Sequence, residues 1–383
     1  MRCGVYLHIP YCSRKCGYCA FHSTTRWTGA AEHELVGKLI SDAELFSGRG
    51  GEPARSLPQV ETKTLYIGGG TPSILGRGQL ARLIGGVVAA LGRPEEITCE
   101  ANPYSAQAGF LAEAAGAGVT RLSIGVQSLS PHLCSVIGRR PTQVGELERI
   151  RAGWDGLLSA DLIIGIPGQT TAELVTDVRR LVRIGFTHLS IYDLSVEAGT
   201  PFARSIASEG IAVSEEGPDW HAVCETLAGF GFIRYEVSNF ARPGNESRHN
   251  LGYWHMEPYL GLGPSATSTL PVNERSVRFV QPTNHADYLG GHPFSDADCE
   301  HLDSDALMTE YLMLGLRTTG GVSFARFRKL FNVDLDALLG DQIAELVTRK
   351  LLVRDEHSLR PTSRGMDLLN RVLARLLDEL PKS

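Results

Sequence analysis

Three cysteines fall within a short stretch, Cys12-Ser-Arg-Lys-Cys16-Gly-Tyr-Cys19, which has a C-x3-C-x2-C spacing. The stretch comes directly after an apolar run, Val5-Tyr-Leu-His8, that is typical of a β-strand. Three thiolates on one loop can bind three irons of a cubane [4Fe-4S] cluster. The fourth iron is then left without a protein ligand, and an open coordination position is where a metal centre binds its substrate.

A structural zinc site is the alternative interpretation of the cysteine loop. It would need a fourth ligand, and the sequence has no second C-x2-C pair, although His8 or His22 could supply one. Eight cysteines in 383 residues are too few for a disulfide framework and indicate a reducing compartment. We interpret the scattered cysteines as small apolar core residues: Cys3, Cys99, Cys134, Cys224 and Cys299.

The composition excludes several classes of protein. Hydrophobic residues make up 43% of the chain and charged residues 21%, which permits a large core and argues against general disorder. No apolar run approaches the ~20 residues of a membrane span, and the first residues lack the apolar segment of a signal peptide. A net charge of -6 argues against nucleic-acid binding. We therefore expect a cytoplasmic protein with no membrane span and no nucleic-acid partner.

Strand-like runs alternate with longer helix-like stretches through the first half of the chain. The expected strands are Val5–His8, Thr64–Ile67, Ile97–Ala101, Arg121–Gly125, Ala160–Ile166 and His188–Tyr192. The expected helices are Glu32–Phe46, Gln79–Leu91, Ala106–Ala115, most of Pro131–Ala152, and Thr171–Ile184, whereas Ser47–Glu61 is expected to be a loop. Six βα units in series predict an α/β fold with a parallel sheet and right-handed crossovers. In such a sheet the site lies at the carboxyl ends of the strands.

The pattern changes after Tyr192. A helix is expected at Glu215–Phe230, and a polar, aromatic segment follows it. From about Asp303 the chain is Leu-rich and helical, with a hairpin-like piece at Leu352–Leu359, which predicts a mostly helical, winged-helix-like domain. We therefore expect three units, 1–200, 201–300 and 301–383.

Polar motifs follow the later strands of the predicted sheet. The glycines of Gly68-Gly-Gly-Thr-Pro72, after the second strand, permit close approach of backbone to a ligand. An arginine in this region suits a carboxylate, because its planar fork binds both oxygens. Each motif alone has an ordinary structural explanation, but their order along the chain favours a site. The further candidates are Glu100, Gln127, Arg139 and Asp161.

The cysteine loop and these motifs, in this order, resemble the radical S-adenosylmethionine (SAM) superfamily. The resemblance implies a partial (β/α)6 barrel in which SAM chelates the open iron and is cleaved by one electron to a 5′-deoxyadenosyl radical. Two later blocks, His249-Asn-Leu-Gly-Tyr-Trp254 and Tyr259-Leu-Gly-Leu-Gly-Pro264, resemble the branch of oxygen-independent coproporphyrinogen III oxidase and its relatives (HemN/HemW-like). The resemblance covers nearly the whole chain, most strongly residues 4–265.

In this branch a second SAM can sit beside the first, so the resemblance implies two SAM positions. The cluster ligands are then Cys12, Cys16 and Cys19, with Tyr6 and Glu100 beside the reacting centre. The residues expected to line the SAM positions are Tyr6, Tyr18, Gly69, Gly70, Thr71, Glu100, Gln127, Arg139 and Asp161.

Three activities within the branch compete. The porphyrinogen oxidases carry a further cysteine where this chain has Phe21, which disfavours coproporphyrinogen III dehydrogenation. The heme chaperones share the block that begins at His249, but typically have an acidic or histidine residue where this chain has Ala20, Thr142 and Thr267. These differences favour the third activity, that of the class C radical SAM methyltransferases and cyclopropanases.

The leading hypothesis from the sequence is therefore methylene transfer. The adenosyl radical would take a hydrogen from the methyl group of the second SAM, and the methylene radical would add to an sp2 carbon of a small natural-product-like substrate. The alternative is a heme chaperone in which His249 takes part in heme binding. Either reading implies an electron donor such as flavodoxin or ferredoxin.

Overall fold

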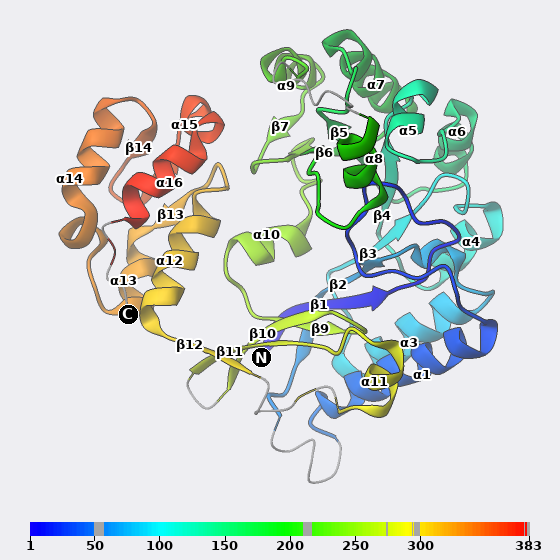
Figure 1. The fold of residues 1–383 in the computed structure, drawn as a ribbon. Coiled ribbons are helices and arrows are strands. Elements are labelled where there is room, and N and C mark those ends of the chain that lie inside the picture. Colours follow the sequence, from blue (N-terminus) through cyan, green and yellow to red (C-terminus); the bar gives the residue numbers. More distant parts are fainter. Residues whose placement is uncertain are drawn as a thin grey trace.

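The computed structural model describes residues 1–49, 57–209, 217–272, 275–292, 294, 299–378 and 380. Six parallel strands form one side of an open barrel (Figure 1). They are β1 (Arg2–Ile9), β2 (Glu61–Gly69), β3 (Glu96–Ala101), β4 (Arg121–Gln127), β5 (Leu157–Ile164) and β6 (His188–Asp193). Each pairs in parallel with the next along the chain, so the expected α/β fold with a partial barrel of six parallel strands is confirmed.

Helices between these strands cover the outside of the barrel (Figure 1). They are α1 (Gly29–Leu45), the short 3-10 helix η1 (Pro72–Ile74), α3 (Gln79–Leu91), α4 (Ala108–Gly116), α5 (Pro131–Val136), α6 (Val144–Ala152) and α7 (Thr171–Ile184). The start of α7 is a capping box, in which the Thr170 hydroxyl accepts from Glu173 N and the Glu173 carboxylate accepts from Thr170 N. The helix ends at Gly185, which adopts the left-handed conformation that is common at helix C-termini.

The helical region Pro131–Ala152 departs from expectation in one respect. It is divided into α5 and α6, and the connection between them carries Arg139, Arg140 and Thr142 to the mouth of a cavity. Two other predicted segments lie partly outside the described residues. Positions 50–56 of the expected loop are not described, and of the helix expected at Glu215–Phe230 the structure shows α9 (Trp220–Gly229).

The sheet continues on both sides of the six strands. Beside β1, β9 (Tyr259–Leu262) pairs in parallel, and β10 (Thr267–Val272), β11 (Arg275–Val280) and β12 (Glu300–Leu302) follow as an antiparallel extension. Beside β6 lie β8 (Asn239–Ala241) and β7 (Ile233–Arg234). The helices of this middle region are α8 (Pro201–Glu209), α9, α10 (Arg248–Trp254) and α11 (His285–Gly290).

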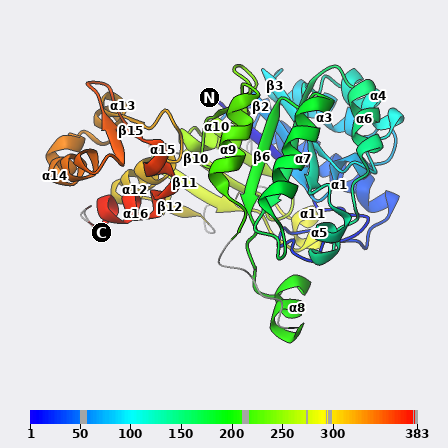
Figure 2. The same cartoon turned by 90° about the horizontal axis from the view of Figure 1, so that it is seen from above.

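The last part of the chain has a hydrophobic core of its own, built from buried residues between Met308 and Leu380. It contains α12 (Ser304–Gly315), α13 (Phe324–Phe331), α14 (Leu335–Thr348), α15 (Ser363–Asp367) and α16 (Leu369–Leu377). A small antiparallel sheet of β13 (Val322–Ser323), β14 (Leu352–Arg354) and β15 (Ser358–Pro361) includes the expected hairpin. Figure 2 shows this unit beside the barrel rather than over its mouth.

The mostly helical character of this last part is confirmed, and the three unit boundaries 1–200, 201–300 and 301–383 stay predictions. In the described part of the chain, every helix is too short or too polar to cross a bilayer.

Candidate functional site

The cysteine loop is closed at its base and anchored on two sides. An isolated bridge between Tyr11 and Thr24 joins its two ends, and Cys12 N donates to Thr24 O at 2.9 Å. At the far end, Gly17 N donates to Ile137 O at 3.2 Å, while Gly17 O accepts from Phe202 N at 2.9 Å. The loop is therefore held between β1, the end of α5 and the start of α8.

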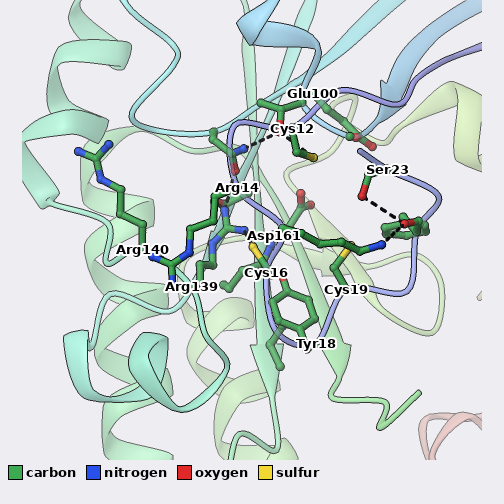
Figure 3. Close-up of a pocket in the computed structure, with 18 of the residues that line it drawn as sticks. Cys12, Arg14, Cys16, Tyr18, Cys19, Ser23, Glu100, Arg139, Arg140 and Asp161 are labelled. Atoms are coloured by element: carbon green, nitrogen blue, oxygen red, sulfur yellow. Dashed lines mark hydrogen bonds between the residues drawn. The ribbon is translucent and has the colours of Figure 1, made fainter. Parts of the chain in front are cut away.

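One cavity of about 750 Å³ lies at the carboxyl ends of the barrel strands, in the size range of small-molecule sites. Figure 3 shows Glu100 and Asp161 facing the same space as the three cysteines of the loop. Tyr6 is not among the lining residues, and its hydroxyl is hydrogen-bonded to His8 Nδ1 at 3.0 Å. The other predicted site residues all line the cavity: Cys12, Cys16, Cys19, Tyr18, Gly69, Gly70, Thr71, Glu100, Gln127, Arg139 and Asp161.

The glycine-rich turn after β2 lies against the backbone of the cysteine loop. Gly70 N donates to Ile9 O at 2.7 Å, and Thr71 N donates to Tyr11 O at 2.8 Å. A Cβ at Gly70 would lie 2.5 Å from Tyr11 O, so only glycine fits here. The turn ends with the Thr71 hydroxyl 3.6 Å from Cys12 Sγ, to which it donates.

Two carboxyl groups face the inside of the barrel from β3 and β5. Burial, together with the negative charge of Asp161, raises the pKa of Glu100 to about 7, and burial raises the pKa of Asp161 to about 6. Glu100 accepts from the Tyr66 hydroxyl at 2.9 Å and from Gly69 N at 3.1 Å, while Ser123 donates to Asp161 at 3.3 Å. The cavity therefore contains two acids suited to the amino or ribose hydroxyl groups of a ligand.

Arg139 crosses the cavity from the connection after α5. It donates to Asn102 Oδ1 at 2.7 Å, to Gly125 O, and to Cys16 Sγ at 3.4 Å. A Cβ at Gly125 would lie 2.9 Å from Arg139 Nη2, so the bare backbone permits the approach of the guanidinium group. Gln127, at the end of β4, has a left-handed φ of 67°, a conformation that is costly for a non-glycine residue and frequent at functional sites.

Sequence reasoning missed several residues that complete the cavity wall. Asn102 Nδ2 donates to the Thr71 hydroxyl at 3.0 Å and to the Tyr104 hydroxyl at 3.2 Å, so it joins the glycine-rich turn to the third βα loop. The guanidinium of Arg140 stacks 4.9 Å from the centre of the Tyr104 ring. One signal could have found Asn102, since it directly follows β3 at the carboxyl edge of the sheet. The other missed lining residues include Tyr66, Ser123 and Tyr192.

His249 lies on α10 with its ring 5.1 Å from that of Tyr66, which lines the cavity, but His249 itself is not among the lining residues. Its side chain is buried, and both ring nitrogens are hydrogen-bonded, Nδ1 to Thr64 Oγ1 at 2.8 Å and Nε2 to the Tyr253 hydroxyl at 2.9 Å. Burial lowers the pKa of His249 to about 3. This packing is at odds with the expectation that His249 contacts heme, because neither nitrogen is available to a ligand.

Among the other cysteines, the expected burial holds for Cys3, Cys99 and Cys134. Cys224 and Cys299 are only partly buried, and both pack at the edge of the main core.

Two family models match separate parts of this chain. Residues 6–181 match the radical SAM superfamily, and residues 302–368 match the HemN C-terminal domain. Three bacterial relatives, each described as heme chaperone HemW, match 98% of the chain. The protein from Lactococcus lactis is 33% identical, and 97% of its length is covered. The protein from Mycobacterium tuberculosis H37Rv is 34% identical, with 94% of its length covered, and the protein from Escherichia coli K12 is 30% identical, with 98% of its length covered. The chain belongs to the HemN/HemW-like branch of the radical SAM superfamily.

A solved structure of this branch agrees on the fold. Coproporphyrinogen III oxidase (HemN) from Escherichia coli superposes with a TM-score of 0.76 over 97% of this chain and 89% of its own, at 18% identity. At that identity the likeness concerns the fold alone. It includes the C-terminal unit, so the HemN/HemW-like architecture extends from the barrel to the last helices.

The comparisons overturn the methyltransferase or cyclopropanase hypothesis, which was wrong. It rested on Ala20, Thr142 and Thr267, three positions at which the sequence differs from the usual heme chaperone pattern. Relatives aligned over nearly the whole chain are nevertheless described as heme chaperones. Of the three positions, Ala20 and Thr142 line the cavity, whereas Thr267 begins β10 and is not among the lining residues. Differences at these three positions therefore indicate the function less well than similarity along the full length of the chain.

Membership of the radical SAM superfamily implies a [4Fe-4S] cluster and SAM, and the residues around the cysteine loop fit a cluster. In a cubane each thiolate binds a different iron, so the thiols should border one space without meeting at one point. All three cysteines line the same cavity, and among the residues that the structure describes no three His, Cys, Asp or Glu side chains gather as a single-ion site. Thr71 donates toward Cys12 Sγ and Arg139 toward Cys16 Sγ.

Proposed function

We propose that this protein is a heme-binding chaperone of the HemW type, with a cluster-binding radical SAM barrel. The observation that carries the proposal is the similarity to heme chaperone HemW from several bacteria over 98% of this chain. The absence of a further cysteine at Phe21 supports a role other than porphyrinogen oxidation. The Phe21 side chain is 70% exposed at the rim of the cavity, where it could contact a flat apolar ligand.

In this proposal Cys12, Cys16 and Cys19 bind the cluster. A bound cluster with SAM would supply one-electron chemistry. Arg139 and Thr71 would orient the cysteine sulfurs that bind the cluster. Glu100 would accept a hydrogen bond from the SAM amino group, and Gly69 would let the backbone approach that group closely. Asp161 and Gln127 face the same space from β5 and β4 and suit its ribose.

A second SAM is part of the proposal. The cavity extends past the cluster loop to Tyr104 and Arg140, so its wall continues beyond the residues proposed to bind the first SAM. Equilibrium dialysis of the reconstituted protein against labelled SAM should therefore give a stoichiometry of two. A reducing partner such as flavodoxin or ferredoxin would approach the cluster along the exposed part of the loop, where Arg14 and Lys15 are exposed at the rim of the cavity.

The test of the proposed function is an anaerobic hemin titration of the protein reconstituted with iron and sulfide. We expect a saturating Soret band at one heme per chain. Repeating the titration with reduced protein and SAM would show whether the cluster site affects heme affinity. A rise in absorbance that stays linear and shows no stoichiometric end point would contradict heme binding as the function.

A further inference from the structure

Asn102 is the first residue after β3, and its side chain lies between the glycine-rich turn and Arg139. Its Oδ1 accepts from Arg139 Nη2 at 2.7 Å, and its Nδ2 donates to the Thr71 hydroxyl at 3.0 Å. The main chain is fixed as well, because the carbonyl of Asn102 accepts from Ser105 N and from Ala106 N, each at 3.0 Å. Asn102 therefore presents its amide from a rigid point at the carboxyl edge of the sheet.

The orientation of this amide follows from the chemistry of its neighbours. A guanidinium group has five N–H donors and no acceptor, so only the amide oxygen of Asn102 can face Arg139. The NH2 group must then face the Thr71 hydroxyl, whose oxygen accepts from it. A hydroxyl that accepts in this way keeps its own hydrogen for a different partner. In the described part of the chain that partner is Cys12 Sγ, 3.6 Å from the Thr71 hydroxyl.

The direction of the Thr71 hydroxyl matters for a bound cluster, because hydrogen bonds to the ligand sulfurs help to set the reduction potential. A reduced cluster carries one more negative charge than an oxidised one. A donor at a ligand sulfur therefore stabilises the reduced state more than the oxidised state, as charge-assisted hydrogen bonds do. A hydroxyl that points steadily at Cys12 Sγ should consequently raise the potential, whereas a hydroxyl that turns to another acceptor should not.

We propose that Asn102 is a positioning residue for the cluster, which keeps the Thr71 hydroxyl directed at Cys12 Sγ and thereby raises the reduction potential. The inference rests on the proposed binding of a cluster by the cysteine loop, and it adds a residue that tunes that cluster. The effect of Asn102 passes through Thr71, since the amide bonds to Thr71, Tyr104 and Arg139 and not to a sulfur. The chain thus sets the potential at which a reducing partner can deliver an electron.

The experiment is a redox titration of the chain reconstituted anaerobically with iron and sulfide, without SAM, followed by the EPR signal of the reduced cluster. Asn102→Asp keeps the shape and the acceptor for Arg139 but cannot donate to Thr71, and the guanidinium beside it keeps the new carboxylate ionised. The Thr71 hydroxyl should then donate to this carboxylate instead of Cys12 Sγ. Thr71→Val removes the same hydroxyl and keeps the branched shape of the side chain.

We expect Thr71→Val to lower the midpoint potential in the wild-type chain and to leave it unchanged in the Asn102→Asp chain, where the hydroxyl has already turned from the sulfur. The added charge is present with and without Thr71→Val in the Asn102→Asp chain, so it cancels in this comparison. Gln107→Glu is the matched control, because it converts an amide to a carboxylate in the same βα loop, at an exposed side chain outside the cavity lining. In Gln107→Glu the effect of Thr71→Val should be as large as in the wild type.

The possible outcomes separate the role of Asn102 from the cluster assignment. Equal shifts by Thr71→Val in the wild-type and Asn102→Asp chains would overturn the proposal, because the two residues would then act independently. An unchanged potential in Thr71→Val alone would also overturn it, since the hydroxyl would then have no effect on the cluster. Loss of the cluster in Asn102→Asp but not in Gln107→Glu would assign Asn102 to cluster binding and overturn the tuning role. A wild-type chain that binds no cluster would instead overturn the assignment on which the inference rests.

Discussion

The side chain of Arg139 donates from Nη1 to Cys16 Sγ at 3.4 Å, across 123 residues of sequence. The same guanidinium donates to Asn102 at 2.7 Å and to the carbonyl of Gly125. A single side chain thus joins the third and fourth βα units to the cysteine loop. Arg139 therefore positions a proposed cluster ligand, in addition to any contact with the carboxylate of SAM.

Arg139→Ala should lower both cluster retention and SAM affinity. Losing a hydrogen bond to a charged group costs about 1.5–3 kcal/mol, which corresponds to roughly a tenfold to hundredfold loss of affinity. Iron and sulfide content after gel filtration would measure the first effect, and equilibrium dialysis the second. Arg149→Ala is the matched control, since Arg149 is exposed on α6 and is not among the residues that line the cavity. If the two variants keep the same iron content, Arg139 has no positioning role.

Replacing any one of Cys12, Cys16 and Cys19 by Ala should abolish the brown cluster absorbance and all SAM cleavage. The barrel should still fold, because the loop is outside the main core and its base is held by backbone hydrogen bonds around Tyr11 and Thr24. Iron content and circular dichroism would check the two halves of the prediction. Cys134→Ser, at a buried position of α5, serves as the comparison. A full cluster in the triple variant would contradict the ligand assignment.

Much of the barrel could be predicted from the sequence because its signals are local. The helices Gln79–Leu91 and Thr171–Ile184 have the predicted bounds, since each is amphipathic and each ends at a left-handed glycine or a glycine cap. Strand ends then placed the polar motifs at one edge of the sheet. The glycine-rich turn could be recognised because glycine there is required by the backbone contact of Gly70 with Tyr11.

What could not be predicted depends on contacts between distant segments. Nothing in the spacing of His249 shows that Thr64 and Tyr253 engage both of its nitrogens. The same holds for Tyr6, whose hydroxyl is hydrogen-bonded to His8 and which is not among the residues that line the cavity. The functional hypothesis was wrong for a related reason. It depended on single residues such as Ala20 and Thr142, whereas the similarity to heme chaperones extends over 98% of the chain.

His249→Ala should destabilise the fold and leave heme affinity unchanged. The substitution leaves the Thr64 and Tyr253 hydroxyls without their buried partner and opens a cavity, which together should cost about 2–4 kcal/mol of unfolding free energy. Urea denaturation would measure the loss, and hemin titration of the folded fraction would test the second part. His249→Gln, which can keep one of the hydrogen bonds, should lose less. Weaker heme binding at unchanged stability would show that the core packing opens to bind heme.

The final prediction concerns the pH dependence that Glu100 should give to the cluster-free protein. Burial and the charge of Asp161 raise the pKa of Glu100 to about 7 in the folded state, above the ordinary value near 4.5. Between these two pH values the folded chain holds a proton that the unfolded chain has released. The unfolding free energy must therefore fall as the pH rises through that window, and it levels off above about pH 7. A shift from 4.5 to about 7 corresponds to roughly 3 kcal/mol.

Glu100→Gln removes this titration, so its urea-unfolding free energy should fall less between pH 5 and 8 than that of the wild type. Part of the slope should remain, because burial also raises the pKa of Asp161 to about 6. Glu148→Gln, at an exposed position of α6, provides the control and should keep the full slope. The glutamine can still accept from the Tyr66 hydroxyl, so the comparison of slopes is not confounded by loss of that bond. Identical slopes in Glu100→Gln and in the wild type would show that Glu100 is ionised in the folded barrel across this range, and that solvent or a cation reaches it there.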